Sequence, residues 1–243
     1  GGKKMKKILS AVFSLCILTS LIFAGDVAVF VDGGFSSDGK SYVFGQYGKT
    51  DKNFQGWAEM IIVDVDKNDY ADNGYFSIKP SAVTKGKNGL DVYDSLAGKN
   101  FYAINKLNLQ KASPDQILYI CEEPYKKGED EIKFTDFLKS DIENPKSYKI
   151  NLVQTVNGSL SKAKSSFYIN VEKYDSNGNV IATQKVGNPD IVRKGITGYK
   201  IEKIISDKSG KKLIFVVEKM MEDATGLNIR YMVEACVLNS DFD

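Results

Sequence analysis

Short runs of alternating apolar and polar residues recur from residue 26 onward, and this period of two is typical of β-strands. Val27, Val29 and Val31 lie in the first run, and the turn sequence Asp38-Gly39-Lys40 separates it from a second run at 41–44. Together these runs predict a hairpin. Further strands are expected at about 58–64, 116–121, 146–156, 165–175, 179–187, 197–206, 211–219 and 227–238.

The period of apolar residues changes to three or four between residues 89 and 107. We expect an amphipathic helix there, which Asn88 or Asp91 can cap at its start. Gly98 falls inside this helix and costs about 1 kcal/mol relative to alanine. A short helical turn is also expected within 131–139.

Two turn sequences refine the expected fold. Asn177-Gly178 stands between two alternating runs and predicts a hairpin with a type I′ turn, since both residues tolerate a positive φ. Residues 36–65 also align without gaps on residues 207–236, either as two blades of a propeller or as two ordinary hairpins. We therefore expect a mainly β fold with one or two helices, its antiparallel hairpins in a sandwich-like or partial-propeller arrangement.

The N-terminal residues have the pattern of a secretory leader. Four lysines precede an apolar run from Ile8 to Ala24, which is short for a membrane span. We expect a signal peptide at 1–24 with cleavage after Ala24, and the membrane to be contacted only through the uncleaved leader. Residues 25–243 would then form a single exported mainly-β domain, with a subdivision near 125–145 left open.

Charge and composition exclude several classes of function. The leader holds four lysines and no acidic residue, so its removal leaves 29 basic residues against 31 acidic ones. Because no basic excess remains, nucleic acid is not an expected partner. The chain has no histidine, which excludes Ser-His-Asp and Cys-His catalysis and histidine-ligated zinc.

The sequence beyond the leader holds two cysteines, Cys121 and Cys236, both in apolar runs. In an oxidising compartment they could form a disulfide, or they could stay separate as small buried hydrophobes. The sequence leaves both alternatives open.

The stretch from Gly34 to Lys40 reads Gly-Phe-Ser-Ser-Asp-Gly-Lys, and Tyr47-Gly48, Asp51 and Val63-Asp64 follow it. This pattern resembles a family of predicted secreted bacterial proteins of unknown function, in which a Gly-Phe-Ser-x-Asp-Gly strand turn precedes a Tyr-Gly-x-x-Asp loop. The lysine-rich stretch 125–139 departs from the family pattern. The resemblance implies export, no established activity and no catalytic residues.

Two stretches with neighbouring acidic residues are candidate sites of chemistry. Asp64, Asp66 and Asn68 have the spacing of a calcium loop, but its sixth position lacks glycine and its twelfth lacks glutamate. Glu122 and Glu123 are adjacent, so on a strand their carboxylates point to opposite faces. We therefore expect no catalytic residue, no metal site and no cofactor.

The loop from Gly45 to Trp57 is the predicted binding surface, because Tyr47, Phe54 and Trp57 stand there among polar residues. The sequence favours an exported non-catalytic binding or structural component of the bacterial envelope, periplasmic or secreted, whose partner is an envelope protein or glycan. A carboxylate- or metal-dependent periplasmic hydrolase is the alternative.

Overall fold

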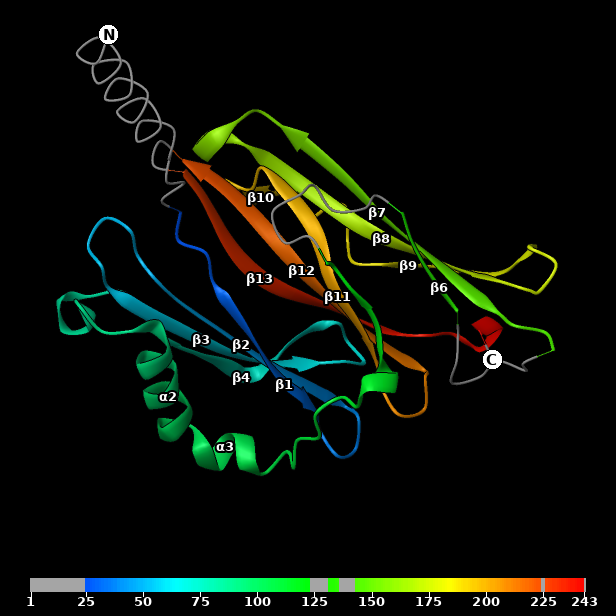
Figure 1. Cartoon of the computed structure of the whole chain (residues 1–243), viewed down its shortest axis with the longest axis horizontal. Helices are drawn as coiled ribbons and strands as arrows, with labels where there is room; N and C mark the ends of the chain where they lie inside the picture. The colour runs from blue at the N-terminus through cyan, green and yellow to red at the C-terminus, as the bar shows by residue number, and fades with distance from the viewer. Residues whose placement is uncertain (1–24, 123–130, 136–142, 224–225, 243) are drawn as a thin grey trace, which may run out of the picture.

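The computed structural model describes residues 25–122, 131–135, 143–223 and 226–242. Three antiparallel sheets stack face to face, and a helical layer covers one outer side (Figure 1). The predicted fold class, mainly β with antiparallel hairpins in a sandwich-like arrangement, is confirmed. The leader predicted at 1–24 lies outside the described residues.

The N-terminal sheet is a meander of four consecutive strands. They are β1 (Val29–Phe35), β2 (Ser41–Lys49), β3 (Gly56–Asp64) and β4 (Asp69–Ile78). The predicted first hairpin is confirmed as β1 and β2.

The central sheet combines strands that are far apart in the sequence, in the order β13-β12-β11-β5. They are β5 (Ile117–Ile120), β11 (Gly198–Ser206), β12 (Lys212–Asp223) and β13 (Gly226–Val237). In this order β5 and β13 are the two edge strands.

The outer sheet contains the remaining strands. They are β6 (Glu131–Thr135), β7 (Ser147–Asn157), β8 (Lys164–Tyr174), β9 (Val180–Val186) and β10 (Arg193–Lys194). The helical turn expected within 131–139 is wrong for residues 131–135, because Ile132 is buried on a strand that pairs with β7. Residues 136–139 lie outside the described part.

The helix predicted at 89–107 is present but broken. It forms α2 (Gly89–Lys99) and α3 (Phe101–Asn105), and Asn88 caps α2 by accepting a hydrogen bond from the Leu90 N–H. The break falls at Asn100, whose side chain donates back to the Leu96 carbonyl at 2.8 Å. Short 3₁₀ turns occur at Ala82–Thr84, Pro114–Gln116, Leu160–Lys162 and Ser240–Phe242. None of the helices in the described ranges is long and apolar enough to cross a membrane.

The layers follow from which strand faces are apolar. In β12, Leu213, Phe215 and Val217 pack against the outer sheet, whereas Ile214 and Val216 pack against the N-terminal sheet. A strand buried on both faces has a continuous apolar run, and this is how β12 reads. The other face of the N-terminal sheet is covered by α2.

The two aligned stretches of sequence adopt similar turns. Gly39 and Gly210 both have a positive φ, 66° and 64°, in turns that lead into β2 and β12. The ammonium of Lys212 donates to the Gly39 carbonyl at 2.8 Å, so the two turns lie side by side. The internal similarity therefore corresponds to two stacked strand-turn units in neighbouring sheets.

The hairpin turn at 175–179 differs from the type I′ turn predicted for it. Gly178 has a positive φ of 83°, whereas Asn177 is not among the residues with positive φ. The Gly178 N–H donates to the Asp175 carbonyl at 3.1 Å, and the Asp175 carboxylate accepts from Asn177 and Asn179. The turn is thus a type I turn followed by a left-handed glycine.

Gly178 and Gly98 form a matched pair for a test of backbone strain, because a Cβ atom would meet nothing within 4 Å at either position. We expect Gly178→Val to lower the free energy of unfolding by more than about 1 kcal/mol, since valine is strained at positive φ. Gly98→Ala should raise it by about 0.5–1 kcal/mol, because alanine favours the helix. Urea denaturation measures both changes, and an unchanged stability in Gly178→Val would contradict the turn assignment.

Candidate functional site

The structure does not bring the three predicted binding residues together as one exposed patch. Phe54 is 61% exposed, whereas Trp57 is only 4% exposed. Tyr47 is half-buried, and its ring centroid lies 5.8 Å from that of Tyr93 in α2. A binding role therefore stays a prediction for Phe54, while Trp57 belongs to the core.

Trp57 is held by residues that are distant in the sequence. Its Nε1 donates to the Asp26 carboxylate at 2.9 Å, and the Arg230 guanidinium lies 4.0 Å from its ring centroid. Arg230 also forms an ion pair with Asp26 at 2.6 Å. This cluster ties the segment before β1 to β13, which explains why an aromatic residue beside a polar loop is buried.

The two cysteines are not joined. Cys121 follows β5 and Cys236 lies in β13, so they belong to opposite edges of the central sheet. Three strand spacings separate them by about 14 Å, which exceeds the Cα distance of about 7 Å that a disulfide can span. Burial raises the pKa of the Cys236 thiol to about 12. Of the two alternatives, separate thiols is therefore the one that the structure shows.

The outer row of β13 is covered at Ile229 by the backbone of residues 26–28, and further along by side-chain amides from other elements. Gln46 of β2 pairs with Tyr231, accepting from its N–H at 2.7 Å and donating to its carbonyl at 3.2 Å. Asn68, in the turn between β3 and β4, accepts from the Ala235 N–H at 2.5 Å. Gln184 of β9 donates to the carbonyl of the last residue of β13 at 2.9 Å. These amides form hydrogen bonds with backbone groups of the edge strand without adding a strand to the sheet.

Val233 is the exception in this row. Its N–H and carbonyl point outward, because they have the same parity along β13 as those of Tyr231 and Ala235. In the described ranges, neither group of Val233 has a hydrogen-bond partner outside the ladder with β12. A donor and an acceptor are thus left together between two covered positions.

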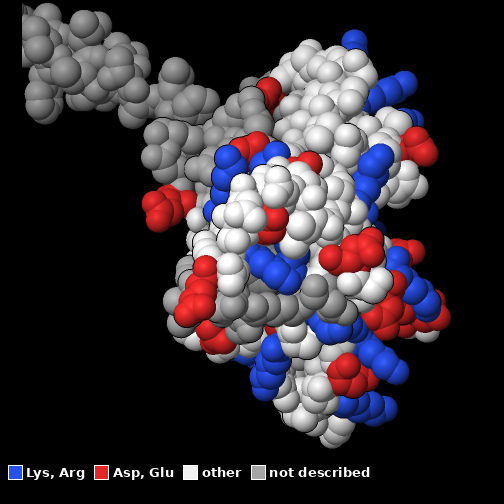
Figure 2. Space-filling view, turned by 90° about the vertical axis from the view of Figure 1, so that its right-hand side faces the viewer, with Lys and Arg blue, Asp and Glu red and all other residues white. Residues whose placement is uncertain are grey.

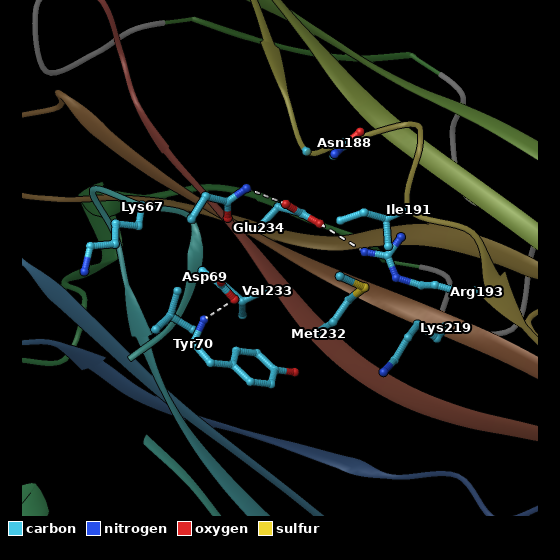
Figure 3. A pocket seen from close by; sticks show the side chains of 13 residues that line it. Lys67, Asp69, Tyr70, Asn188, Ile191, Arg193, Lys219, Met232, Val233 and Glu234 are labelled. Carbon is cyan, nitrogen blue, oxygen red and sulfur yellow. Dashed lines mark hydrogen bonds and ion pairs between the residues drawn. The ribbon is translucent and has the colours of Figure 1, made fainter. Parts of the chain in front are cut away.

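A cavity of about 430 Å³ opens at Val233 (Figure 3). Its walls come from the β3–β4 turn, the start of β4, the loop between β9 and β10, and strands β12 and β13. Figure 3 shows the ammonium of Lys219 and the hydroxyl of Tyr70 pointing toward one another within it. The cavity therefore joins elements of all three sheets, since Arg193 of β10 also lines it.

Two cations in the cavity are incompletely paired. Lys219 is half-buried, and among the described residues no carboxylate lies within ion-pair distance of its ammonium. Burial lowers the pKa of Lys219, with Glu59 opposing this and Arg193 reinforcing it. Arg193 approaches Glu234 at 3.7 Å, and its other terminal nitrogen, Nη1, is buried without a hydrogen-bond partner in that same described part.

Glu234 is the buried acid of the site. Its carboxylate accepts from the Asn68 amide at 2.6 Å, and burial raises its pKa while Asn68 and Arg193 act in the opposite direction. The Asn68 side chain thus bonds both to the backbone of Ala235 and to the side chain of Glu234, which fixes the Glu234 carboxylate on one wall of the cavity. Such an arrangement offers donors, acceptors and cations for binding.

The oxygen-bearing residues of the β3–β4 turn serve separate contacts. Asp64 accepts from the Lys67 N–H at 3.1 Å, Asp66 pairs with Lys212 at 2.8 Å, and Asn68 contacts β13. Within the described residues, no group of three His, Cys, Asp or Glu side chains is placed to hold a metal ion.

Sequence reasoning missed this cavity, although one signal pointed to it. Arg193 and Arg230 are the only arginines in the chain, and each has a buried acid as partner. Arg193 lies beside β13, and Arg230 lies within it. Elsewhere basic and acidic side chains are interleaved over the face seen in Figure 2. The scarce arginines therefore mark the buried ion pairs of the β13 edge.

The fold and this site define a layered β protein with a polar cavity at an edge strand. Over residues 43–236 the chain matches the family described as predicted secreted protein (DUF2259), and it belongs to that family. No curated protein matches it. The secreted family of unknown function that the resemblance implied is confirmed, whereas the turn motif at 34–39 precedes the matched residues.

The raised pKa of Glu234 predicts how its replacement changes the pH dependence of stability. The folded state binds this proton more tightly than the unfolded state, so wild-type protein loses stability as pH rises from the ordinary value of 4.5 through the raised pKa. Glu234→Gln does not titrate, and its melting temperature relative to wild type should therefore rise between pH 4 and pH 7.

Glu131→Gln is the control with the opposite sign. Its hydrogen bond with Lys133 lowers the pKa of this exposed acid, so wild type should gain stability relative to the variant over the same pH range. Parallel pH profiles for the two variants would contradict the burial of an ionisable group at Glu234.

Proposed function

We propose that this chain is an exported, non-catalytic binding protein of the bacterial envelope, which takes a small polar ligand into the cavity at the β13 edge. Its membership of a secreted family supports action outside the cytoplasm. The leader at 1–24 would deliver it to the periplasm or the exterior.

The observation that carries this proposal is the outward N–H and carbonyl of Val233. Buried strands normally satisfy both groups, and leaving them unbonded costs free energy. Here they open into a cavity of about 430 Å³, within the range of pockets that hold small ligands. The walls are fixed by Asn68, Glu234 and Arg193, so the cavity needs little rearrangement to accept a ligand.

One cluster favours the alternative, a carboxylate-dependent hydrolase. Glu218 and Glu202 approach the same ammonium of Lys200, at 2.9 Å and 3.4 Å, and burial raises the pKa of Glu218. However, the side chains of Lys200 and Glu218 are 1% and 4% exposed. A substrate would have no access to them in this conformation, and so binding at the β13 edge is the stronger proposal.

A substitution that fills the cavity tests the proposed function. Ile191 lines the cavity from an exposed loop, and Ile191→Trp should exclude the ligand without disturbing the core. The neighbouring Val192 is also exposed but does not line the cavity, so Val192→Trp is the matched control.

Native mass spectrometry of protein purified from the exported fraction of its own host should show a retained small molecule in wild type and Val192→Trp. Ile191→Trp should lose it at an unchanged melting temperature. Equal retention by both variants, or the absence of any retained molecule, would contradict the proposal. Turnover of an envelope substrate that is lost in Glu202→Gln would support the hydrolase instead.

A further inference from the structure

We propose that the ligand of this cavity is a short peptide with a free C-terminal carboxylate, whose carboxylate pairs with Lys219 and whose amide pairs with Val233. This inference rests on the proposed binding function and names its ligand class.

The charges of the cavity walls indicate that the ligand carries a carboxylate. Lys67, Arg193 and Lys219 are the cations that line the cavity, and Asp69 and Glu234 are the acids. Lys67 is already paired with Asp64 at 3.1 Å, outside the cavity lining, and Arg193 faces Glu234. Lys219 is left as a half-buried ammonium with no carboxylate at ion-pair distance in the described residues. An anionic group of the ligand would complete it.

The geometry of β13 indicates that a backbone amide of the ligand pairs with Val233. An extended peptide residue offers one donor and one acceptor on the same edge, which matches the outward pair of Val233. Gln46 and Asn68 already occupy the positions on either side, at Tyr231 and Ala235. A long strand therefore cannot add to this edge, and only one residue of the ligand can pair with it.

The distance between the two contacts sets the length of the ligand. Lys219 lies opposite Arg230, three positions along β13 from Val233. At about 3.3 Å per residue the separation along β13 is about 10 Å, and β12 lies about 4.8 Å to the side of β13; the lysine side chain itself spans part of this distance. A dipeptide or tripeptide covers the remainder, because each extended residue adds about 3.3 Å.

Isothermal titration calorimetry with alanyl-alanine and its C-terminal amide tests the inference. The acid should bind wild type, and the amide should bind at least about tenfold more weakly, since the neutral amide cannot form the charge-assisted hydrogen bond to Lys219. Lys219→Met should weaken binding of the acid by a similar factor at an unchanged melting temperature, because methionine keeps the apolar stem. Lys219→Arg keeps the positive charge and should bind the acid as wild type does.

Lys67→Met is the control, since Lys67 lies at the exposed rim and already has a partner. Loss of binding in this variant equal to that in Lys219→Met would overturn the assignment of Lys219. Equal binding of the acid and the amide, both abolished by Ile191→Trp, would overturn the carboxylate inference while the binding function stands. If neither peptide binds and the native ligand is not a peptide, the peptide inference is likewise overturned while the binding function stands. If no molecule occupies the cavity at all, the proposed function fails as well.

Discussion

The burial of both faces of the central sheet is the constraint on which the rest of the structure depends. A sheet covered on two sides needs strands without a polar face, and β12 meets this need with the buried run from Leu213 to Val217. It also needs two covering sheets, each of which requires only one apolar face toward it. The helix α2 then packs on the second face of the N-terminal sheet, where Val92 and Leu96 contact Met60.

Stacking covers the faces of the central sheet but leaves its edges, and β13 is protected in a different way. Beyond the short backbone pairing of residues 26–28 with Ile229, side-chain amides occupy the places where a neighbouring strand would pair, which supplies donors and acceptors but offers no further edge for association. Because Gln46 and Asn68 contact residues four positions apart, one residue between them stays unpaired. The cavity at Val233 is thus a by-product of how the edge is closed.

Much of the fold could be predicted because one-sided burial leaves a period of two in the sequence, as in β7 and β8. The strand β4 was not predicted from the sequence, because it is a largely exposed edge strand with no regular alternation of apolar residues. Trp57 was misplaced because the residues that bury it, Asp26 and Arg230, are far away in the chain. The site could not be predicted for the same reason, since Arg193, Lys219 and Glu234 come from three strands with no shared spacing.

The order of the strands along the chain also affects the time course of folding. The N-terminal sheet pairs consecutive segments within 29–78, whereas the central sheet must join β5 to strands that begin at residue 198. Local pairings close sooner than distant ones because their loops cost less entropy. We therefore expect the apolar face of the N-terminal sheet, including Phe44 and Ile61, to form before the strands that cover it. In a secreted chain that emerges N-terminus first, the arrival of β12 and β13 sets how long that face stays open to aggregation.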